Sequence, residues 1–100
     1  MSETHEMKCW PEPFAALRNG TKTFELRRDD RGFATGDALV IYEWVPGPEL
    51  HRGDYRRKTP AGPRQDPLRL RVTYVLHGGR FGLPEGLVVM SVVMVESDDE

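Results

Sequence analysis

A proline-rich stretch in the middle of the chain most constrains the possible folds. Between Pro46 and Pro67 the sequence reads PGPELHRGDYRRKTPAGPRQDP and contains five prolines and three glycines. Proline cannot donate a backbone hydrogen bond, so no long ladder of such bonds can run through this stretch. We therefore predict a mobile loop at 46–67 between two segments of regular structure.

The length of the chain indicates one domain. A chain of 100 residues buries roughly 60 to 70% of the surface that its unfolded form exposes, which is enough for a single core. We expect this domain to cover residues 1–95. The last five residues, ESDDE at 96–100, carry four acids and are expected to form a disordered acidic tail.

Composition argues against several kinds of protein. The single cysteine, Cys9, cannot form an internal disulfide, and neither it nor the three histidines have the spacing of a zinc site. The N-terminal residues MSETHEMK do not resemble an apolar signal segment, and the longest apolar run, Leu87 to Val95, is far shorter than the ~20 residues of a membrane helix. We expect a cytoplasmic monomer without a metal or another cofactor.

Segments of alternating or β-branched residues indicate five strands, at HEMKCW, KTFELRR, ALVIYEWV, LRLRVTYVL and LVVMSVVMV. The alternation places Phe24 and Leu26 inward in the second strand, and the continuous apolar run of the last strand indicates burial on both of its faces. A short helix, PEPFAALRNG, begins at Pro11 and is capped by Gly20. The prediction is an α+β fold, a small, mostly antiparallel β-barrel of about five to six strands with one or two short helices.

The predicted core follows from the inward positions of these elements. The strand LRLRVTYVL, for example, places Val72 and Tyr74 on the same face as its leucines. We assign nine residues to the core: Phe14, Leu17, Phe24, Leu39, Ile41, Val72, Tyr74, Val89 and Val92.

Opposite charges lie close together in the strand KTFELRR. Glu25 and Arg27 are two residues apart, so both project from one face, and an exposed pair of this kind contributes only ~0 to 1 kcal/mol. The alternative to a solvated pair is the wall of a polar site that reads a base and its phosphate. Lys22 joins that site only at the lip of the strand, beside Gly20, or on a bulge. The hypothesis of a polar site predicts that Lys22, Glu25 and Arg27 share one concave surface next to Pro11–Asn19.

Three segments carry a family resemblance: HEMKCWPEPF, GTKTFELRRDDRGFATGD and YVLHGGRFGLPEGLVVMSV. The most specific element is G-x-K-x-x-E-x-R, formed by Gly20, Lys22, Glu25 and Arg27. The chain resembles the ASCH domain family of the PUA-like superfamily, and is similar to a small bacterial and phage branch of unassigned function. The resemblance implies a PUA-like barrel with a cleft beside the helix that holds RNA or a single modified base.

The resemblance implies binding or catalysis. The family includes proposed RNA-binding modules, an amidohydrolase acting on acetylcytidine and a reported ribonuclease. The amidohydrolases carry K-x-x-T, whereas this chain has Lys22 followed by Glu25, and a carboxylate cannot replace a hydroxyl nucleophile. We therefore favour a module that binds RNA or a modified nucleoside or nucleotide. The alternative is a metal-independent hydrolase of an acylated nucleoside or of RNA, in which Lys22 and Glu25 are catalytic.

Further candidate binding residues lie outside this motif. They are His5, Lys8 and Trp10 before the helix, and Arg80 in the glycine-rich loop HGGRFG, where a sharply bent backbone presents an arginine for phosphate or stacking. A tryptophan beside Pro11 is equally typical of helix packing, and a lone histidine on a strand is more often a structural hydrogen bonder.

A basic stretch adds a candidate electrostatic surface. Between Arg52 and Arg71 there are seven basic and two acidic residues, with Arg56, Arg57 and Lys58 at its centre. Although the whole chain has a net charge of -2, clustered basic residues can supply a phosphate-binding surface. We expect this stretch to make sequence-independent contacts with RNA.

Overall fold

The computed structural model describes residues 2–46, 53–54 and 66–95. Along the chain the elements are β1 (Thr4–Cys9), α1 (Pro11–Asn19), β2 (Phe24–Arg28), β3 (Ala38–Glu43), β4 (Val45–Pro46), β5 (Gly53–Asp54), β6 (Leu68–His77) and β7 (Leu87–Met94). Within these residues no helix has the length and apolar character needed to span a membrane.

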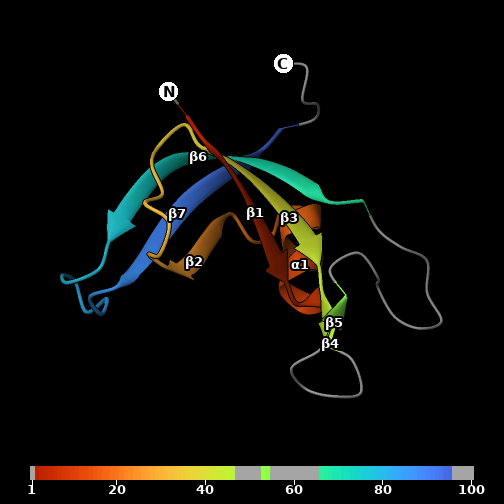
Figure 1. The fold of residues 1–100 in the computed structure, drawn as a ribbon, viewed down its shortest axis with the longest axis horizontal. Helices are drawn as coiled ribbons and strands as arrows, with labels where there is room; N and C mark the ends of the chain where they lie inside the picture. Colours follow the sequence, from red (N-terminus) through yellow and green to blue (C-terminus); the bar gives the residue numbers. More distant parts are fainter. Residues whose placement is uncertain (1, 47–52, 55–65, 96–100) are drawn as a thin grey trace.

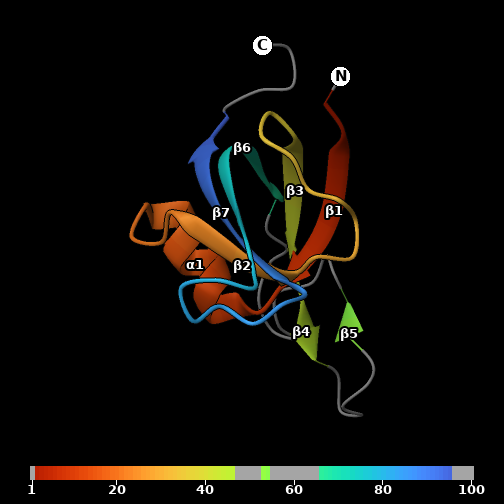
Figure 2. The ribbon, with the colours of Figure 1, turned by 90° about the vertical axis from the view of Figure 1, so that its left-hand side faces the viewer.

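Five of the strands form one sheet in the order β1-β3-β6-β7-β2. β1 and β3 run parallel, and the other neighbours run antiparallel. The sheet curls, and α1 lies on its open side near the ends of β1 and β3 (Figures 1 and 2). Across the described residues no backbone ladder joins β1 to β2, so the curled sheet is a half-barrel. The predicted α+β fold, small, mostly antiparallel and barrel-like, is confirmed.

The predicted loop at 46–67 contains one short piece of regular structure. β4 and β5 pair antiparallel, with Val45 opposite Asp54 and Pro46 opposite Gly53. Residues 47–52 and 55–65 lie outside the described residues, and with them the basic triplet Arg56, Arg57 and Lys58. The predicted tail at 96–100 lies outside them as well.

The helix α1 is short because its ends are fixed by the local sequence. Pro11 is the first helical residue, and Gly20 ends the helix in the left-handed conformation, with φ of 88°. Proline suits the first position because no intrahelical donor is lost there, and glycine takes positive φ without steric cost. Phe14 and Leu17 project from one face of the helix and are fully buried.

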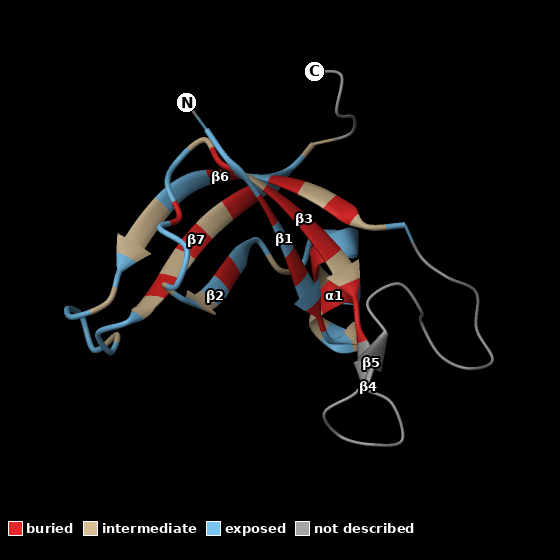
Figure 3. Cartoon of the chain, viewed as in Figure 1, coloured by how far each residue is buried: buried red, intermediate tan, exposed pale blue. Residues whose placement is uncertain are grey.

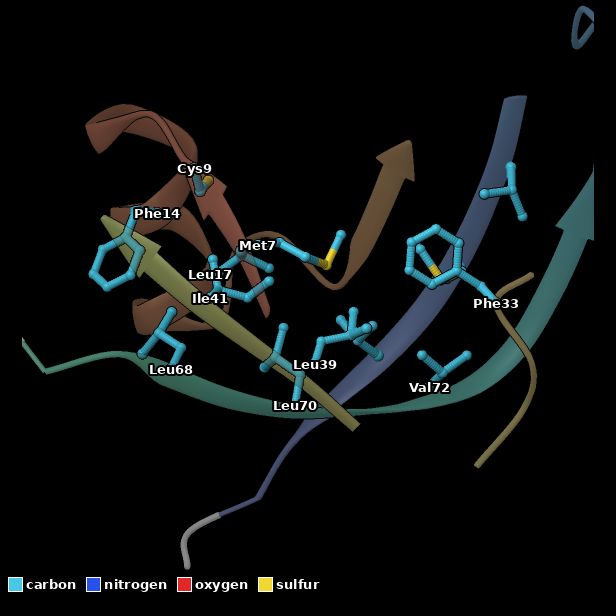
Figure 4. Packing of buried hydrophobic residues seen from close by; sticks show 13 residues of the cluster. Met7, Cys9, Phe14, Leu17, Phe33, Leu39, Ile41, Leu68, Leu70 and Val72 are labelled. Atoms are coloured by element: carbon cyan, nitrogen blue, oxygen red, sulfur yellow. The ribbon is translucent and has the colours of Figure 1, made fainter. Parts of the chain in front are cut away.

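Buried residues alternate with exposed or partly buried ones along β1, β2 and β7 (Figure 3). The buried hydrophobic side chains gather on the concave side of the half-barrel, where α1 packs against the sheet (Figure 4). The core consists of Met7, Cys9, Phe14, Leu17, Phe33, Leu39, Ile41, Leu68, Leu70, Val72, Val88, Met90 and Val92. The core positions predicted at Phe14, Leu17, Leu39, Ile41, Val72 and Val92 are confirmed. The other three predicted positions are wrong.

The prediction of which face of β2 is buried is wrong. Phe24 and Leu26 are 46% and 51% exposed, whereas Glu25 is 2% exposed. Across the ladder, Glu25 lies opposite Met90 of β7 and Arg27 lies opposite Val88. The side chains of Met90 and Val88 are fully buried. The charged face of β2 therefore points into the half-barrel. The alternation of apolar residues predicts the opposite facing, because it takes no account of a carboxylate that can be buried when neighbouring cations pair with it, as Lys22 and Arg27 pair with Glu25.

The predictions for β6 and β7 fail at two further positions. A register shift between Val72 and Tyr74 turns Tyr74 outward, where it is 63% exposed, and Val75 packs against the core instead. Such a bulge reverses the facing of every later residue in a strand. In β7, buried and partly buried residues alternate: Val88 is buried, whereas Val89 is only partly buried. The strand is therefore not buried on both faces, and Val89 is not part of the core.

Asp37 holds the start of β1 against β3. Its carboxylate is buried, accepts hydrogen bonds from the backbone N–H groups of Glu3 and Ala34 at 3.0 Å each, and lies 2.8 Å from Nε2 of His5. The chain reaches Asp37 through a turn in which Gly36 has φ of 96°. Burial raises the pKa of the Asp37 carboxyl, but the three hydrogen bonds favour the charged form, and its pKa lies below its ordinary value.

Substitution of Asp37 by asparagine tests this anchor. At pH 7 we expect Asp37→Asn to lower the free energy of unfolding by about 1–3 kcal/mol, because hydrogen bonds to a buried charged acceptor are lost. The folded-state pKa is lowered, so the contribution is present above the unfolded value of about 3.9 and is lost as the pH falls through the folded-state pKa. Denaturant unfolding should show a smaller difference between the two proteins at pH 3 than at pH 7.

The exposed residue Asp30 provides the matched control. Its side chain is 58% exposed, so Asp30→Asn should change the free energy of unfolding by less than about 0.5 kcal/mol. An Asp37→Asn effect that is the same at both pH values would contradict a role for the negative charge.

Candidate functional site

A cleft lies between the two end strands of the sheet, β1 and β2. Its volume is about 390 Å³. It is lined by the end of β1, the start of α1 and the segment leading through β2: Lys8, Cys9, Trp10, Pro13, Lys22, Glu25, Leu26 and Arg27. We call this hollow the seam cleft, because it follows the side on which the half-barrel stays open.

Glu25 is the buried charge of the seam cleft. Its side chain is 2% exposed, and each of its oxygens accepts a hydrogen bond from a cation. Lys22 Nζ lies 2.9 Å from Oε2, and Arg27 Nε lies 2.8 Å from Oε1. Charge-assisted hydrogen bonds on both oxygens offset the cost of removing the carboxylate from water. Two cations around one anion leave the cluster with net positive charge.

Lys22 reaches Glu25 because it precedes the strand rather than lying within it. β2 begins at Phe24, and the backbone N–H of Lys22 donates to the carbonyl of Ala16 in the last turns of α1, at 3.0 Å. The strict alternation of a strand therefore does not apply to Lys22. Its ammonium also lies 5.1 Å from the ring centre of Phe24, a cation–π contact. Lys22 therefore lies at the lip of β2, near Gly20, as predicted.

Two arginines, Arg27 in β2 and Arg31 in the segment after it, bind β1 across the seam. Arg27 Nη2 donates to the carbonyl of Lys8 at 3.0 Å, and Arg31 Nη1 donates to the carbonyl of Glu6 at 2.8 Å. Both carbonyls belong to β1. Glu6 and Lys8 are its exposed residues, and they alternate with the buried residues His5, Met7 and Cys9. Side chains thus satisfy backbone acceptors of β1 that a neighbouring strand would otherwise bind.

Aromatic side chains form the other rim of the seam cleft. Trp10 is 60% exposed, and its ring centre lies 6.4 Å from that of the buried Trp44. The ammonium of Lys8 lies 4.5 Å from the Trp44 ring centre. An exposed indole backed by a second ring is a suitable platform on which a planar ligand can stack.

Cys9 lines the cleft as a protonated thiol. The pKa of Cys9 is raised from 9.0 to about 11, chiefly by burial and then by the negative charge of Glu25, whereas Lys22 and Arg27 act in the opposite direction. Because the thiolate is the reactive form of cysteine, this thiol is a weak nucleophile near neutral pH. The cleft therefore offers no activated sulfur.

The structure brings together most of the predicted site residues. Lys8, Trp10, Lys22, Glu25 and Arg27 all line one cleft, next to α1 as predicted. Of the other predicted binding residues that the structure describes, His5 and Arg80 lie outside this cleft.

His5 and Arg80 are not part of the seam cleft. His5 is buried against Asp37, and its ring lies 4.8 Å from that of Phe33, so its visible role is structural. Arg80 lies in the turn between β6 and β7, where its guanidinium is 5.2 Å from the ring centre of Phe81.

Sequence reasoning missed three residues that line the cleft: Cys9, Pro13 and Leu26. The alternation of β1 contains a signal for Cys9, since it shares the inward face with Met7. Leu26 could not be found in this way, because the predicted facing of β2 was inverted. Over the described ranges no three His, Cys, Asp or Glu side chains gather in a manner that could hold a metal ion.

The sequence that forms this half-barrel matches a known family of domains. A family described as "Domain of unknown function (DUF3850)" matches residues 4–92, from the first residue of β1 into β7. The chain belongs to this family.

The chain is also similar to a protein of Escherichia phage P2, named "Uncharacterized 12.9 kDa protein in GpA 3'region". The two are 38% identical over 47 residues, which cover 47% of this chain and 43% of the phage protein. The similarity thus spans less than half the length of that relative.

The thiol of Cys9 reports the electrostatics of the cleft. We expect the midpoint of the pH dependence of iodoacetamide labelling of the native protein to lie near pH 11, and Glu25→Gln to move it to lower pH because a negative charge is removed. Mass spectrometry of the labelled protein measures the rates. Glu85→Gln, a change at an exposed carboxylate in the turn between β6 and β7, is the control and should leave the midpoint unchanged. A midpoint near 8.5 in the wild type would contradict this description of the site.

Proposed function

We propose that the seam cleft binds RNA or a modified nucleoside or nucleotide. The observation that carries the proposal is the position of the buried carboxylate of Glu25, held between Lys22 and Arg27, in a cleft whose rim is an exposed tryptophan. A nucleotide offers what this arrangement complements: a flat ring, a polar base edge and negative phosphate oxygens.

Each group in the cleft has a distinct role in this proposal. The ring of Trp10 stacks on the base. An ionised carboxylate has about four lone-pair sites, so Glu25 can accept a hydrogen bond from an exocyclic amine while keeping its two cations. Lys22 has further N–H donors beyond the one that it gives to Glu25, and these face the phosphate or a carbonyl oxygen of the base.

Positive charge in the cleft and in the basic stretch adds attraction for phosphate to this proposal. The cluster of two cations and one anion attracts phosphate, and the basic stretch around Arg56, Arg57 and Lys58 adds contacts that weaken as salt rises. We further propose that this family is related to ASCH domains of the PUA-like superfamily, and that the protein acts in the cytoplasm. The G-x-K-x-x-E-x-R element supports the relationship, since its charged residues form the centre of the cleft.

A second candidate is a metal-independent hydrolase of an acylated nucleoside or of RNA. The distance of 2.9 Å between Lys22 Nζ and Glu25 Oε2 favours it, because a base and a neighbouring cation can activate water and stabilise developing negative charge. Two features favour binding instead. Glu25 is almost fully buried, and both of its oxygens already accept a hydrogen bond from a cation.

Tryptophan fluorescence can test the binding site directly. Titration with a panel of nucleotides, modified nucleosides and short single-stranded RNAs should quench the exposed Trp10. Trp10→Ala should weaken binding of a ligand found in this way by about fivefold to 150-fold, as expected for loss of a base stack, measured by isothermal titration calorimetry. Phe81→Ala is the matched control, since Phe81 is an exposed aromatic with an arginine beside it, outside the seam cleft.

The result that contradicts the proposal is equally specific. If Phe81→Ala weakens binding and Trp10→Ala does not, the ligand binds at the turn between β6 and β7. If no member of the panel binds at low salt, the cleft is not a nucleotide site.

Glu25→Gln separates the binding module from the hydrolase. The amide keeps the size of the side chain but cannot accept a proton, so turnover by a hydrolase should fall on the order of a hundredfold while ligand affinity is retained. For a binding module we expect no turnover in the wild type, and affinity altered by about 1–3 kcal/mol because a charge-assisted contact is lost. Chromatographic detection of product, alongside calorimetry, distinguishes the two results.

A further inference from the structure

The seam cleft and the whole chain carry charges of opposite sign. The lining of the cleft includes three cations, Lys8, Lys22 and Arg27, and a single carboxylate, that of Glu25. Cys9 is a protonated thiol near neutral pH and adds no charge. The lining therefore has a net charge of +2, whereas the chain has a net charge of -2. A cleft lined mainly by cations raises the local concentration of anionic ligands.

A second carboxylate near the cleft, that of Glu43, does not cancel this charge. Glu43 lies opposite Cys9 in the ladder between β1 and β3, and it is not among the residues that line the cleft. Burial has the largest effect on the pKa of Cys9, and among the charged groups that also shift this pKa, Glu43 has the smallest effect. The charges of the lining itself therefore dominate the electrostatic field in the cleft.

Lys22 and Arg27 retain hydrogen-bond donors for an anion. The ammonium of Lys22 donates to Glu25, and its other N–H groups are available to a ligand. Arg27 donates through Nε to Glu25 and through Nη2 to the carbonyl of Lys8, which leaves the N–H groups of Nη1. The two side chains are 20% and 25% exposed, so both can be reached from the cleft, and their ion pairs with Glu25 hold them in place.

Two kinds of phosphate differ in how well they match this lining. A phosphate monoester carries a charge of about −1.5 to −2 at pH 7 and offers three strong acceptor oxygens. A phosphodiester, the internal linkage of a nucleic-acid strand, carries a single negative charge and has one acceptor oxygen fewer. The monoester therefore complements a net charge of +2 more completely, and it can accept charge-assisted hydrogen bonds from both Lys22 and Arg27.

We propose that the seam cleft recognises a terminal phosphate, that is, a phosphate monoester on a nucleoside or at the end of an RNA strand. The phosphate binds Lys22 and Arg27, and the base lies toward Trp10. The inference rests on the proposed nucleotide function and narrows its ligand to a phosphate monoester. The cleft volume of about 390 Å³ lies in the lower part of the range for sites that hold one small ligand, and so suits a single terminal nucleotide.

Isothermal titration calorimetry of the wild-type protein tests the charge of the ligand. The probes are each common ribonucleoside, its 5′-monophosphate and the methyl ester of that monophosphate. We expect the tightest monophosphate to bind at least about tenfold more tightly than its methyl ester, because a charge and an acceptor oxygen are lost in the ester. Short RNAs with a 5′-phosphate, a 3′-phosphate or hydroxyl groups at both ends distinguish a free nucleotide from a strand end as the source of the phosphate.

A variant that removes one positive charge tests the contribution of the lining. Lys8→Gln leaves the ion pairs of Glu25 intact, and we expect it to weaken binding of the monophosphate by about threefold to tenfold and that of the methyl ester by less, because the monoester carries more charge. Arg80→Gln is the matched control. It removes the same charge at an exposed residue in the turn between β6 and β7, outside the cleft, and should leave both affinities unchanged.

The outcomes separate this inference from the proposed function. A methyl ester or a hydroxyl-ended RNA that binds as tightly as the matching monoester would overturn the inference and leave the nucleotide function standing. Equal losses in Lys8→Gln and Arg80→Gln would overturn it too, because the charge of the whole chain would then set the affinity. Phenyl phosphate and its methyl ester complete the series. If phenyl phosphate binds at least about tenfold more tightly than its ester while no nucleotide binds, the terminal-phosphate site is supported and the nucleotide function fails. Absence of binding by every probe would overturn both.

Discussion

The buried carboxylate of Glu25 determines how the rest of the structure is arranged. A carboxylate that is 2% exposed is stable only because Lys22 and Arg27 each bind one of its oxygens. To form these contacts, β2 must turn its charged face into the half-barrel and its apolar residues outward. The orientation of β2 then fixes three other features: the polar centre of the seam cleft, the link from Arg27 to β1, and the exposure of Phe24 and Leu26 on the outer face.

The seam cleft exists because the sheet curls without closing. The parallel pair β1 and β3 places β1 at one end of the sheet, and α1 connects it to β2 at the other. Asp37 fixes the start of β1 through backbone hydrogen bonds and His5, while arginines hold the carbonyls further along the strand. Side chains thus replace a strand-to-strand ladder at the seam. A site bounded by side chains can be polar, whereas a closed small barrel is filled by its core.

Sequence patterns predicted most of the fold and the centre of the site. The proline and glycine of α1, the alternation of β1 and the β-branched residues of β3 each indicate a local structure that the packing preserves. The G-x-K-x-x-E-x-R element led to Lys22, Glu25 and Arg27, and the structure brings all three into one cleft. Their spacing along a strand end is a local property, so it could be found without the tertiary structure.

The errors have a common physical origin. Two features that a pattern of hydrophobic residues does not reveal place Phe24 and Tyr74 outside the core. The buried ion cluster around Glu25 turns Phe24 outward, and the bulge in β6 turns Tyr74 outward. His5 resembled a site residue because the sequence does not reveal that Asp37, 32 residues later, is its partner. Such long-range pairs are set by the register of strands, which a single sequence specifies only weakly.

A double-mutant cycle between Glu25 and Arg27 tests the central claim most directly. The free energies of unfolding of the wild type, Glu25→Gln, Arg27→Met and the double variant give the coupling between the two side chains. If the buried ion cluster holds β2 in its observed orientation, the coupling energy should be about 1–3 kcal/mol and stabilising. A coupling below about 0.3 kcal/mol would show that the two residues act independently, and would contradict the account.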